Sequence, residues 1–348
     1  MPSKRRITSH EVAKRAGVSR TTVSFVLNEV ESAQISEETR QRVLQAARDL
    51  GYVPDAAARS LASGRTHILG LIICQPANHL MIDAYIHQVI YGLSEAGHER
   101  GFRVLLESVE DVSQPDAYTH LVRSNRIDGI LLSGPRSDDM QLPALIADGF
   151  PTVLLGRLRG APVCFVDVDN QAAAHRAVAH LVKLGHQRIA CITNGPLAYT
   201  SAADRLLGYR QALRQARLDE EEDLIQYGDF DMESGYRAMQ TLLTVKPRPT
   251  AVFVASDVVA FGAMAAIRDS HLSIPEDMAI VGFDDVPMAR FVAPALTTIR
   301  LSAIEQGRRG GEMLIDLIEG KKLVEQQAFL SAELMVRQSC GAGLLCQG

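Results

Sequence analysis

The chain has 348 residues, of which 47% are hydrophobic and 22% are charged. These values are typical of folded globular proteins, so they exclude wholesale disorder, and the length predicts two or three domains. The net charge of -5 hides an asymmetry, because residues 1–65 carry eleven Lys and Arg against seven Asp and Glu. A small basic segment on an acidic body suits nucleic-acid binding by that segment alone, and it equally fits an ordinary module with a solvated basic face.

Three helices are expected in residues 1–54. Residues 8–11 have the Ser/Thr-x-x-Glu spacing of a capping box and begin the first helix, which Gly17 ends. The second helix covers residues 19–27 and the third covers residues 36–51. Apolar residues of the second helix follow the i, i+3, i+4 spacing of an inward face. The side chains left on its outer face are Arg20, Thr21, Thr22, Ser24, Phe25 and Asn28.

Two helices joined by a tight glycine turn, with small polar residues on the second, have the geometry of a helix-turn-helix. The second helix of that motif enters the major groove of DNA. Hydroxyl and guanidinium groups there reach phosphates and base edges. The same helical hairpin also occurs in ordinary helical bundles, so this pattern alone leaves both interpretations open.

A longer segment of the sequence resembles the signature of one family. Residues 11–24, Glu-Val-Ala-Lys-Arg-Ala-Gly-Val-Ser-Arg-Thr-Thr-Val-Ser, resemble the signature of the lactose/galactose-repressor (LacI/GalR) family of bacterial transcription regulators. Gly-Tyr-Val-Pro at 51–54 and Ala-Arg-Ser-Leu-Ala at 58–62 resemble its hinge segment. The resemblance implies a DNA-binding head over residues 1–54 and a hinge helix with linker over 55–66. It implies DNA contacts by Ser9, Ser19, Arg20, Thr21, Thr22, Ser24, Phe25, Asn28, Ser36, Ala58 and Leu61.

Within that family, two hinge helices pair in the minor groove, and by resemblance Leu61 would wedge between base pairs. Two positions depart from the family pattern. Phe25 stands where an arginine that can read guanine is most frequent, and Asp55 stands where asparagine is usual. Phe25 donates no hydrogen bond, so we expect an apolar contact, for instance with a thymine methyl group. The operator is therefore expected to differ from the commonest half-site of the family.

From residue 68 onward, β-branched apolar runs alternate with segments of helical periodicity, which predicts an α/β fold with parallel sheets covered on both faces. The pattern passes through two cycles that divide near Val166, so we expect two similar subdomains with a cleft between them. The expected strands are 69–74, 103–107, 129–133, 152–155, 165–167, 188–193, 251–255, 279–283 and 297–299. The expected helices are 87–100, 171–184, 202–216, 234–245 and 258–268.

The family's core resembles periplasmic sugar-binding proteins, in which the chain crosses three times between subdomains. The resemblance therefore places 67–166 and about 297–325 in an N-terminal core subdomain. It places 167–296 and about 326–340 in a C-terminal core subdomain.

Ligands of open α/β sheets bind beyond the carboxyl ends of the strands. Carboxylates, an arginine, hydroxyls and an aromatic follow those ends here, and that set suits a polyhydroxylated molecule. By family resemblance Arg205 grips the effector, Asp284 accepts its hydroxyls and Phe230 stacks on it. The resemblance adds Tyr85, Asp169, Tyr199, Ser201 and Asp257 to the effector-binding residues. Asp257 equally suits the cap of the helix that follows it.

The resemblance implies a ligand-responsive repressor that binds a near-palindromic operator on double-stranded DNA as a homodimer. Its effector is expected to be a sugar or, as the alternative, a nucleoside or purine. A solute-binding protein of a transporter would need a signal peptide and no basic head. An enzyme would need a motif such as G-x-S-x-G, a P-loop, G-x-G-x-x-G or HExxH, and the sequence contains none of them.

The start of the chain is basic but leads into polar residues, so we expect no secretory signal. Five cysteines lie far apart with no CxxC pair, which favours a reducing compartment over a disulfide framework or a zinc site. We therefore expect a bacterial cytoplasmic protein, at the nucleoid when it is bound to DNA. No cofactor, no metal and no membrane contact are expected.

Overall fold

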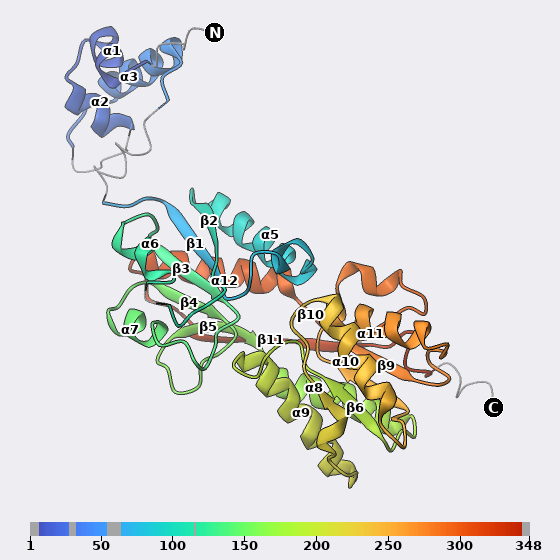
Figure 1. The fold of residues 1–348 in the computed structure, drawn as a ribbon. Helices are drawn as coiled ribbons and strands as arrows, with labels where there is room; N and C mark the ends of the chain where they lie inside the picture. The colour runs from blue at the N-terminus through green and yellow to red at the C-terminus, as the bar shows by residue number, and fades with distance from the viewer. Residues whose placement is uncertain (1–6, 28–32, 54–63, 115, 343–348) are drawn as a thin grey trace. The chain divides into compact units, whose positions relative to one another are not determined.

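The computed structural model describes residues 7–27, 33–53, 64–114 and 116–342. The chain forms two compact units that divide between His67 and Ile68 (Figure 1). The N-terminal unit is helical, and the C-terminal unit contains two six-stranded sheets. In the part of the chain that the structure describes, no helix is long and apolar enough to cross a membrane.

The N-terminal unit contains the three expected helices, α1 (Ser9–Ala16), α2 (Arg20–Leu27) and α3 (Glu37–Leu50). Each begins at a side chain that satisfies its free amide groups, as its sequence predicts. The Glu11 carboxylate accepts the Thr8 amide at 2.8 Å. The three helices pack around a small apolar core: Val12, Ala13, Ala16, Val23, Val26, Val43, Ala46 and Ala47.

The first sheet of the C-terminal unit is entirely parallel and has the order β11-β5-β4-β3-β1-β2. Its strands are β1 (Ile68–Ile73), β2 (Arg103–Ser108), β3 (Gly129–Ser133), β4 (Thr152–Leu155), β5 (Cys164–Val168) and β11 (Gln327–Leu330). One face packs on α5 (Ala84–Glu99) and α12 (Ala303–Ile318), and the other packs on α6 (Thr119–Arg123) and α7 (Leu142–Ala147). A 3-10 turn, η1 (His79–Met81), precedes α5. We call this sheet with its helices the first lobe.

The second sheet has the order β12-β10-β9-β8-β6-β7, and only β12 runs antiparallel to its neighbour. Its strands are β6 (Ile189–Ile192), β7 (Ile225–Gln226), β8 (Ala251–Val254), β9 (Ala279–Asp284), β10 (Thr297–Leu301) and β12 (Ala332–Met335). Helices α8 (Asn170–Lys183) and α9 (Thr200–Ala216) cover one face, and α10 (Met232–Thr244) and α11 (Asp257–Asp269) cover the other. Two 3-10 turns complete this second lobe, η2 (Glu222–Leu224) and η3 (Pro287–Arg290).

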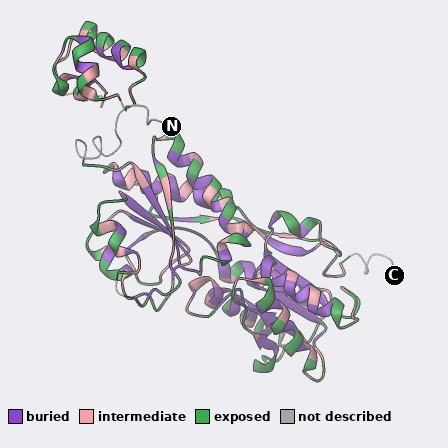
Figure 2. Ribbon diagram, turned by 45° about the horizontal axis from the view of Figure 1, so that its top comes forward, coloured by how far each residue is buried: buried purple, intermediate pink, exposed green. Residues whose placement is uncertain are grey.

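The inner strands of both sheets, β1, β3, β4 and β5 in the first and β6, β8, β9 and β10 in the second, are buried on their two faces, which explains their continuous apolar sequences (Figure 2). The edge strands β2, β11 and β12 are partly exposed. The expected α/β architecture, with a helical head and two similar lobes, is therefore present. Antiparallel β12 is the exception to the expected parallel sheets.

The expected crossing points between lobes, near residues 166, 296 and 326, are wrong by a few residues. β5 continues in the first sheet to Val168. β10 pairs with β9 and β12, so residues 297–301 belong to the second lobe. β11 pairs with β5, so residues 327–330 belong to the first lobe. The strand partners decide these boundaries, and they lie far away in the sequence.

Helices α5 and α12 cross at two glycines. A Cβ on Gly92 would lie 2.0 Å from the Ile304 carbonyl oxygen, and a Cβ on Gly307 would lie 2.2 Å from that of Val89. Neither position accommodates a side chain without moving a backbone. The two helices therefore approach closely, with the first turn of α12 against the middle of α5, and Gln306 of α12 reaches Tyr85 at the start of α5.

Candidate functional site

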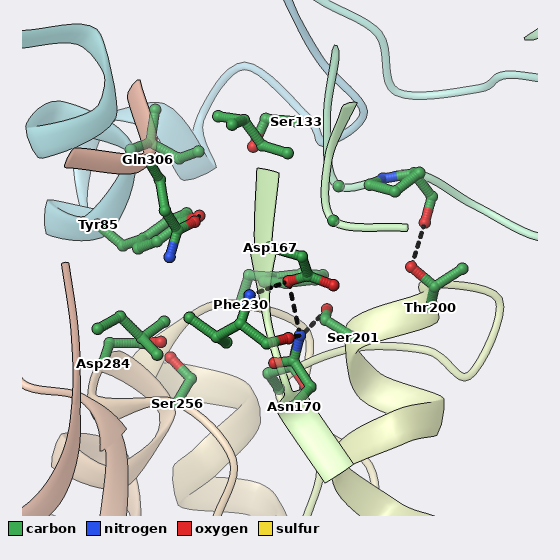
Figure 3. Close-up of a pocket in the computed structure, with 18 of the residues that line it drawn as sticks. Tyr85, Ser133, Asp167, Asn170, Thr200, Ser201, Phe230, Ser256, Asp284 and Gln306 are labelled. Atoms are coloured by element: carbon green, nitrogen blue, oxygen red, sulfur yellow. Dashed lines mark hydrogen bonds between the residues drawn. The ribbon is translucent and has the colours of Figure 1, made fainter. Parts of the chain in front are cut away.

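A pocket with a cavity volume of about 70 Å³ lies between the two lobes, at the carboxyl ends of strands from both sheets. Parallel strands direct their carboxyl ends to one edge, so the loops that follow them converge there. Figure 3 shows side chains of both lobes around this space.

The first lobe contributes Tyr85 from the start of α5 and Gln306 from the first turn of α12. The Asp83 carboxylate caps α5 by accepting the Tyr85 amide at 3.0 Å. The Tyr85 hydroxyl donates to Gln306 Oε1 at 2.7 Å. The close crossing of α5 and α12 therefore fixes two polar side chains on one wall of the pocket.

A chain of hydrogen-bonded polar side chains begins at Arg205 on α9 of the second lobe and ends at Asp167 of the first lobe. Arg205 Nε donates to Asn170 Oδ1 at 2.8 Å, and its Nη1 donates to the Ala255 carbonyl at 2.6 Å. Asn170 Nδ2 donates in turn to Asp167 Oδ1 at 3.0 Å (Figure 3). Arg205 Nη1 also lies 3.6 Å from Asp284 Oδ1. These contacts hold Arg205 in one orientation at the floor of the pocket.

Burial dominates the electrostatics of this site. It raises the pKa of Asp167 to about 7, against the lowering effects of the Val168 amide and the Arg205 charge. Burial likewise raises the pKa of Asp284 to about 7, although the neighbouring Arg205 charge lowers it. The pKa of Asp83 is also raised by burial. Near neutral pH the Asp167 and Asp284 carboxyl groups are therefore partly protonated, so they can donate as well as accept hydrogen bonds.

Phe230 supplies an apolar surface among these polar groups. Its ring packs edge-on against Tyr199 with the centroids 4.8 Å apart. A Cβ on Gly195 would lie 2.2 Å from the Phe230 ring, so a glycine at that position makes room for the aromatic side chain. One aromatic face beside hydroxyl and carboxyl groups is suited to a ligand that has both C–H and O–H surfaces.

Three buried polar atoms of the pocket have no hydrogen-bond partner within the described residues: Gln75 Oε1, Asn194 Oδ1 and Gln306 Nε2. Two of them are acceptors and one is a donor. Unpaired buried polar atoms cost folding free energy, and in a pocket they indicate positions where a ligand supplies the missing partner.

The two lobes are also linked directly beside the pocket. The loop after β3 and the loop before α9 exchange backbone bonds, from Ser137 N to the Ala198 carbonyl at 2.8 Å and from Thr200 N to the Pro135 carbonyl at 3.2 Å. The Tyr199 hydroxyl donates to the Cys74 carbonyl of the first lobe at 2.5 Å. We call these three bonds the clasp.

A second set of contacts between the lobes is ionic. Arg157 Nη2 and Arg159 Nη2, from the loop after β4, lie 2.9 and 2.6 Å from the two carboxylate oxygens of Asp204 on α9. No local pattern in the sequence indicates the role of these two arginines, because their partner Asp204 lies on the other lobe.

In the N-terminal unit, the second helix presents the expected outer face. Arg20 and Thr21 are exposed, Thr22 and Ser24 are half-buried, and Phe25 is 39% exposed. Ser19 caps this helix by accepting the Thr22 amide at 3.0 Å. Of the other residues expected at DNA, Ser9 begins α1 and Ser36 caps α3, while Asn28, Ala58 and Leu61 lie outside the described residues.

Comparison with known proteins identifies the family. Residues 8–55 match the model of the bacterial regulatory proteins of the lacI family, and residues 178–340 match a periplasmic binding protein-like domain. The chain is 36% identical over 343 residues to the HTH-type transcriptional regulator CelR of Thermobifida fusca, covering 97% of this chain and 100% of that one. The chain belongs to the lacI family of transcription regulators.

Other family members agree with this assignment. The HTH-type transcriptional repressor PurR of Klebsiella pneumoniae is 34% identical over 340 residues, covering 97% of each chain. The structure of a CelR–cellobiose complex has a TM-score of 0.74 at 35% identity and covers 96% of this chain and all of that one. The lac repressor dimer bound to operator and the anti-inducer ONPF has a TM-score of 0.84 at 28% identity, over 97% of this chain and 99% of that one. The expected family, fold class and DNA-binding regulatory role, rather than an enzymatic one, are therefore confirmed.

Five of the eight residues assigned to the effector from the family pattern line the pocket: Tyr85, Ser201, Arg205, Phe230 and Asp284. Asp169 does not, because its carboxylate caps α8 by accepting the Ala172 amide at 2.9 Å and faces a separate surface depression. Tyr199 lies behind Phe230, where its hydroxyl is part of the clasp.

Asp257 also has a structural position rather than a place on the pocket wall. It is fully buried and accepts the Thr298 hydroxyl at 2.6 Å and the Val286 amide at 2.9 Å. The alternative role as a helix cap is wrong as well, because Ser256 occupies the N-cap position of α11. Asp257 therefore connects α11 to β10 and to the turn after β9.

The family pattern missed Asp167, Asn170 and Gln306 as pocket residues. Asp167 lies near the carboxyl end of β5 and Asn170 begins the helix after it, so the rule that ligands bind at strand ends includes both. Gln306 lies five residues beyond β10, on a helix of the other lobe, and no local signal marks it.

Proposed function

We propose that this lacI-family regulator is an effector-responsive repressor, which binds a near-palindromic operator as a homodimer and a sugar in the pocket between its lobes. The observation that carries the proposal is the pairing, in one chain, of a helix with an exposed polar face and a pocket with unpaired buried polar atoms.

The exposed face of α2 supports the DNA-binding half of the proposal. Helix-turn-helix proteins read base edges with the side chains near the start of their second helix. We propose contacts to phosphates and base edges by Ser9, Ser19, Arg20, Thr21, Thr22, Ser24, Phe25 and Ser36, all of which the structure describes. Because one head reads one half-site, a two-fold dimer accounts for an operator with half-sites about 34–36 Å apart or a multiple of that. The lac repressor relative, solved as a dimer on its operator, supports the same arrangement.

The pocket supports the effector-binding half. Hydroxyl groups both donate and accept hydrogen bonds, so a sugar can pair with the two unpaired acceptors, the unpaired donor and the carboxyl groups. The Phe230 ring offers its face to a C–H surface of the ligand. The relative CelR was solved with the sugar cellobiose, which favours this class over the nucleoside or purine.

We propose that the two halves communicate through the hinge and linker, residues 55–66. Effector binding in the pocket changes how the lobes close on each other, and a dimer transmits that change to the spacing of its two heads. A regulator of this kind acts where the chromosome is, in the bacterial cytoplasm.

The experiment has two steps. Purified full-length protein selects duplexes from a random library, and the enriched sequence is tested by gel shift. An inverted repeat supports the proposal, and the absence of any enriched sequence refutes it. Each sugar, nucleoside and purine of a panel is then added to the protein–operator complex. A sugar that changes operator affinity supports the effector assignment, whereas a response to purines alone replaces the sugar with the alternative class.

A further inference from the structure

The Gln306 side chain has one half of its hydrogen bonding satisfied and the other half not. It is 2% exposed, and its Oε1 accepts the Tyr85 hydroxyl at 2.7 Å. Its Nε2 has no partner in the described parts of the chain. A tyrosine hydroxyl carries a single proton, so Tyr85 engages one end of the carboxamide and leaves the other end unpaired.

The unpaired nitrogen belongs to the pocket. In Figure 3 the Gln306 amide nitrogen points from the first-lobe wall toward the space above Asp284 and Ser256. The helix that carries Gln306 is fixed against α5 because the neighbouring Gly307 packs on the Val89 carbonyl. The nitrogen therefore cannot turn far, and a molecule in the pocket meets it as a hydrogen-bond donor in a set position.

The charged side chains of the pocket restrict the charge of the ligand that it can bind. Among the described residues that line it, Arg205 carries the one positive side chain, while Asp83, Asp167 and Asp284 are carboxyl groups. The guanidinium group is already bonded to Asn170 and the Ala255 carbonyl. A phosphate or carboxylate on the ligand would therefore meet three carboxyl groups and only one cation, which is already partly engaged.

We propose that Gln306 determines effector specificity, by donating a hydrogen bond from its amide nitrogen to an oxygen of an uncharged polyhydroxylated effector, with Tyr85 as the positioning residue that holds the amide. This inference rests on the proposed sugar-binding function and adds to it a donor on the first lobe and the exclusion of sugar phosphates.

The test uses calorimetric titration of the full-length protein with glucose, galactose, maltose and cellobiose and with glucose 6-phosphate. The variant is Gln306→Met, which keeps an unbranched side chain and removes both polar ends. The matched control is Gln240→Met, at an exposed position of α10. For the uncharged sugar that the wild type binds most tightly, Gln306→Met is expected to raise Kd about tenfold, whereas Gln240→Met leaves it unchanged.

Thermal unfolding without sugar distinguishes a role of Gln306 in ligand binding from a purely structural role. The double variant Gln306→Met/Tyr85→Phe removes the unpaired buried amide nitrogen together with the hydroxyl that would lose its partner. Without sugar it is therefore expected to unfold at or above the wild-type temperature. A structural role predicts a lower unfolding temperature with unchanged sugar affinity, and that result would overturn the proposal.

The positioning role of Tyr85 has its own measurement. Monodeoxy analogues of the same sugar are titrated against wild type, Tyr85→Phe and Gln306→Met. The wild type is expected to lose about tenfold in affinity for the analogue that lacks the recognised oxygen. Gln306→Met should show no such loss, and Tyr85→Phe should show a reduced one. Equal losses in all three proteins would refute the assignment of both residues.

The remaining outcomes are equally decisive. Tighter binding of glucose 6-phosphate than of every uncharged sugar overturns the exclusion of charged ligands. A wild type that binds none of the sugars overturns this proposal together with the sugar effector. A wild type that selects no operator, yet binds a sugar with the expected dependence on Gln306, refutes the proposed repressor and leaves the present inference standing.

Discussion

The close crossing of α5 and α12 predicts that a single methyl group at Gly307 damages both stability and the pocket. In Gly307→Ala the new Cβ would lie 2.2 Å from the Val89 carbonyl oxygen, far inside the 3.4 Å at which such contacts become ordinary. A backbone oxygen cannot rotate away, so the two helices must separate by roughly 1 Å. That movement also stretches the hydrogen bond between Tyr85 and Gln306.

Overpacking of this kind costs about 1–3 kcal/mol, which for a unit of this size lowers Tm by roughly 2–5 °C. The matched control is Gly97→Ala on α5, the helix against which Gly307 of α12 packs; there the new Cβ lies 3.6 Å from its nearest neighbour, the Phe102 carbonyl oxygen. Because alanine is the better helix former, this control is expected to be neutral or to gain up to about 1 kcal/mol. Thermal unfolding followed by circular dichroism compares the two variants. Equal Tm values for both would show that the helix crossing is not rigid and would refute the reasoning.

Four further outcomes are expected. Arg20→Ala should weaken operator binding in gel shifts by about tenfold without changing Tm, since this side chain is exposed; an unchanged affinity would contradict the proposed recognition helix. Phe25→Arg should change the base preference of selected operators, and identical selected sequences would contradict a base contact. Arg205→Lys keeps the charge beside Asp284 but not the bond to Asn170. The variant protein should therefore need about 10–100-fold more sugar to change operator binding, while without sugar it should bind the operator as the wild type does. Burial raises the pKa of Asp167 to about 7, so between the ordinary carboxyl pKa and about 7 the folded state retains a proton that the unfolded state releases. The unfolding free energy of the wild type should therefore fall with rising pH across that range, and Asp167→Asn should lack this part of the fall. Parallel Tm curves of the two proteins from pH 5 to 8 would contradict it.

The features that the sequence predicted correctly are local. The capping serines at 19 and 36, the capping box at the first helix and the buried strands each depend on residues within a few positions of one another. Short strands without an apolar run were missed for the same reason. β7 has two residues, and β11 alternates in exposure because it lies at the edge of its sheet.

The order of lobe crossings depends on pairing across long distances in sequence. Nothing within residues 297–301 indicates whether this strand joins β9 or a strand of the first lobe. The same holds for β11, whose partner β5 lies about half the chain away. A boundary between lobes is therefore less predictable than the strand that forms it.

The candidate site was predictable as a region and only in part as a set of side chains. Tyr199 and Thr200 are neighbours after the same strand, yet Thr200 lines the pocket while Tyr199 points behind Phe230 to the Cys74 carbonyl. Asp257 was misassigned because its partner Thr298 lies on a strand 41 residues away. Which neighbour faces a ligand is settled by packing from distant segments.

The clasp has a consequence for the speed of the response. In the proposed mechanism the lobes open and close around the effector, and their separation breaks the backbone bonds from Ser137 to Ala198 and from Thr200 to Pro135 as well as the bond from Tyr199 to Cys74. Capture of a ligand likewise waits for an opened form, so the association rate falls below the diffusion limit in proportion to the time spent open. The residence time of the bound molecule is then set by the protein's own opening rate. A cell that uses this chain as the proposed effector-responsive repressor would then keep its transcriptional state for some time after the external signal has gone.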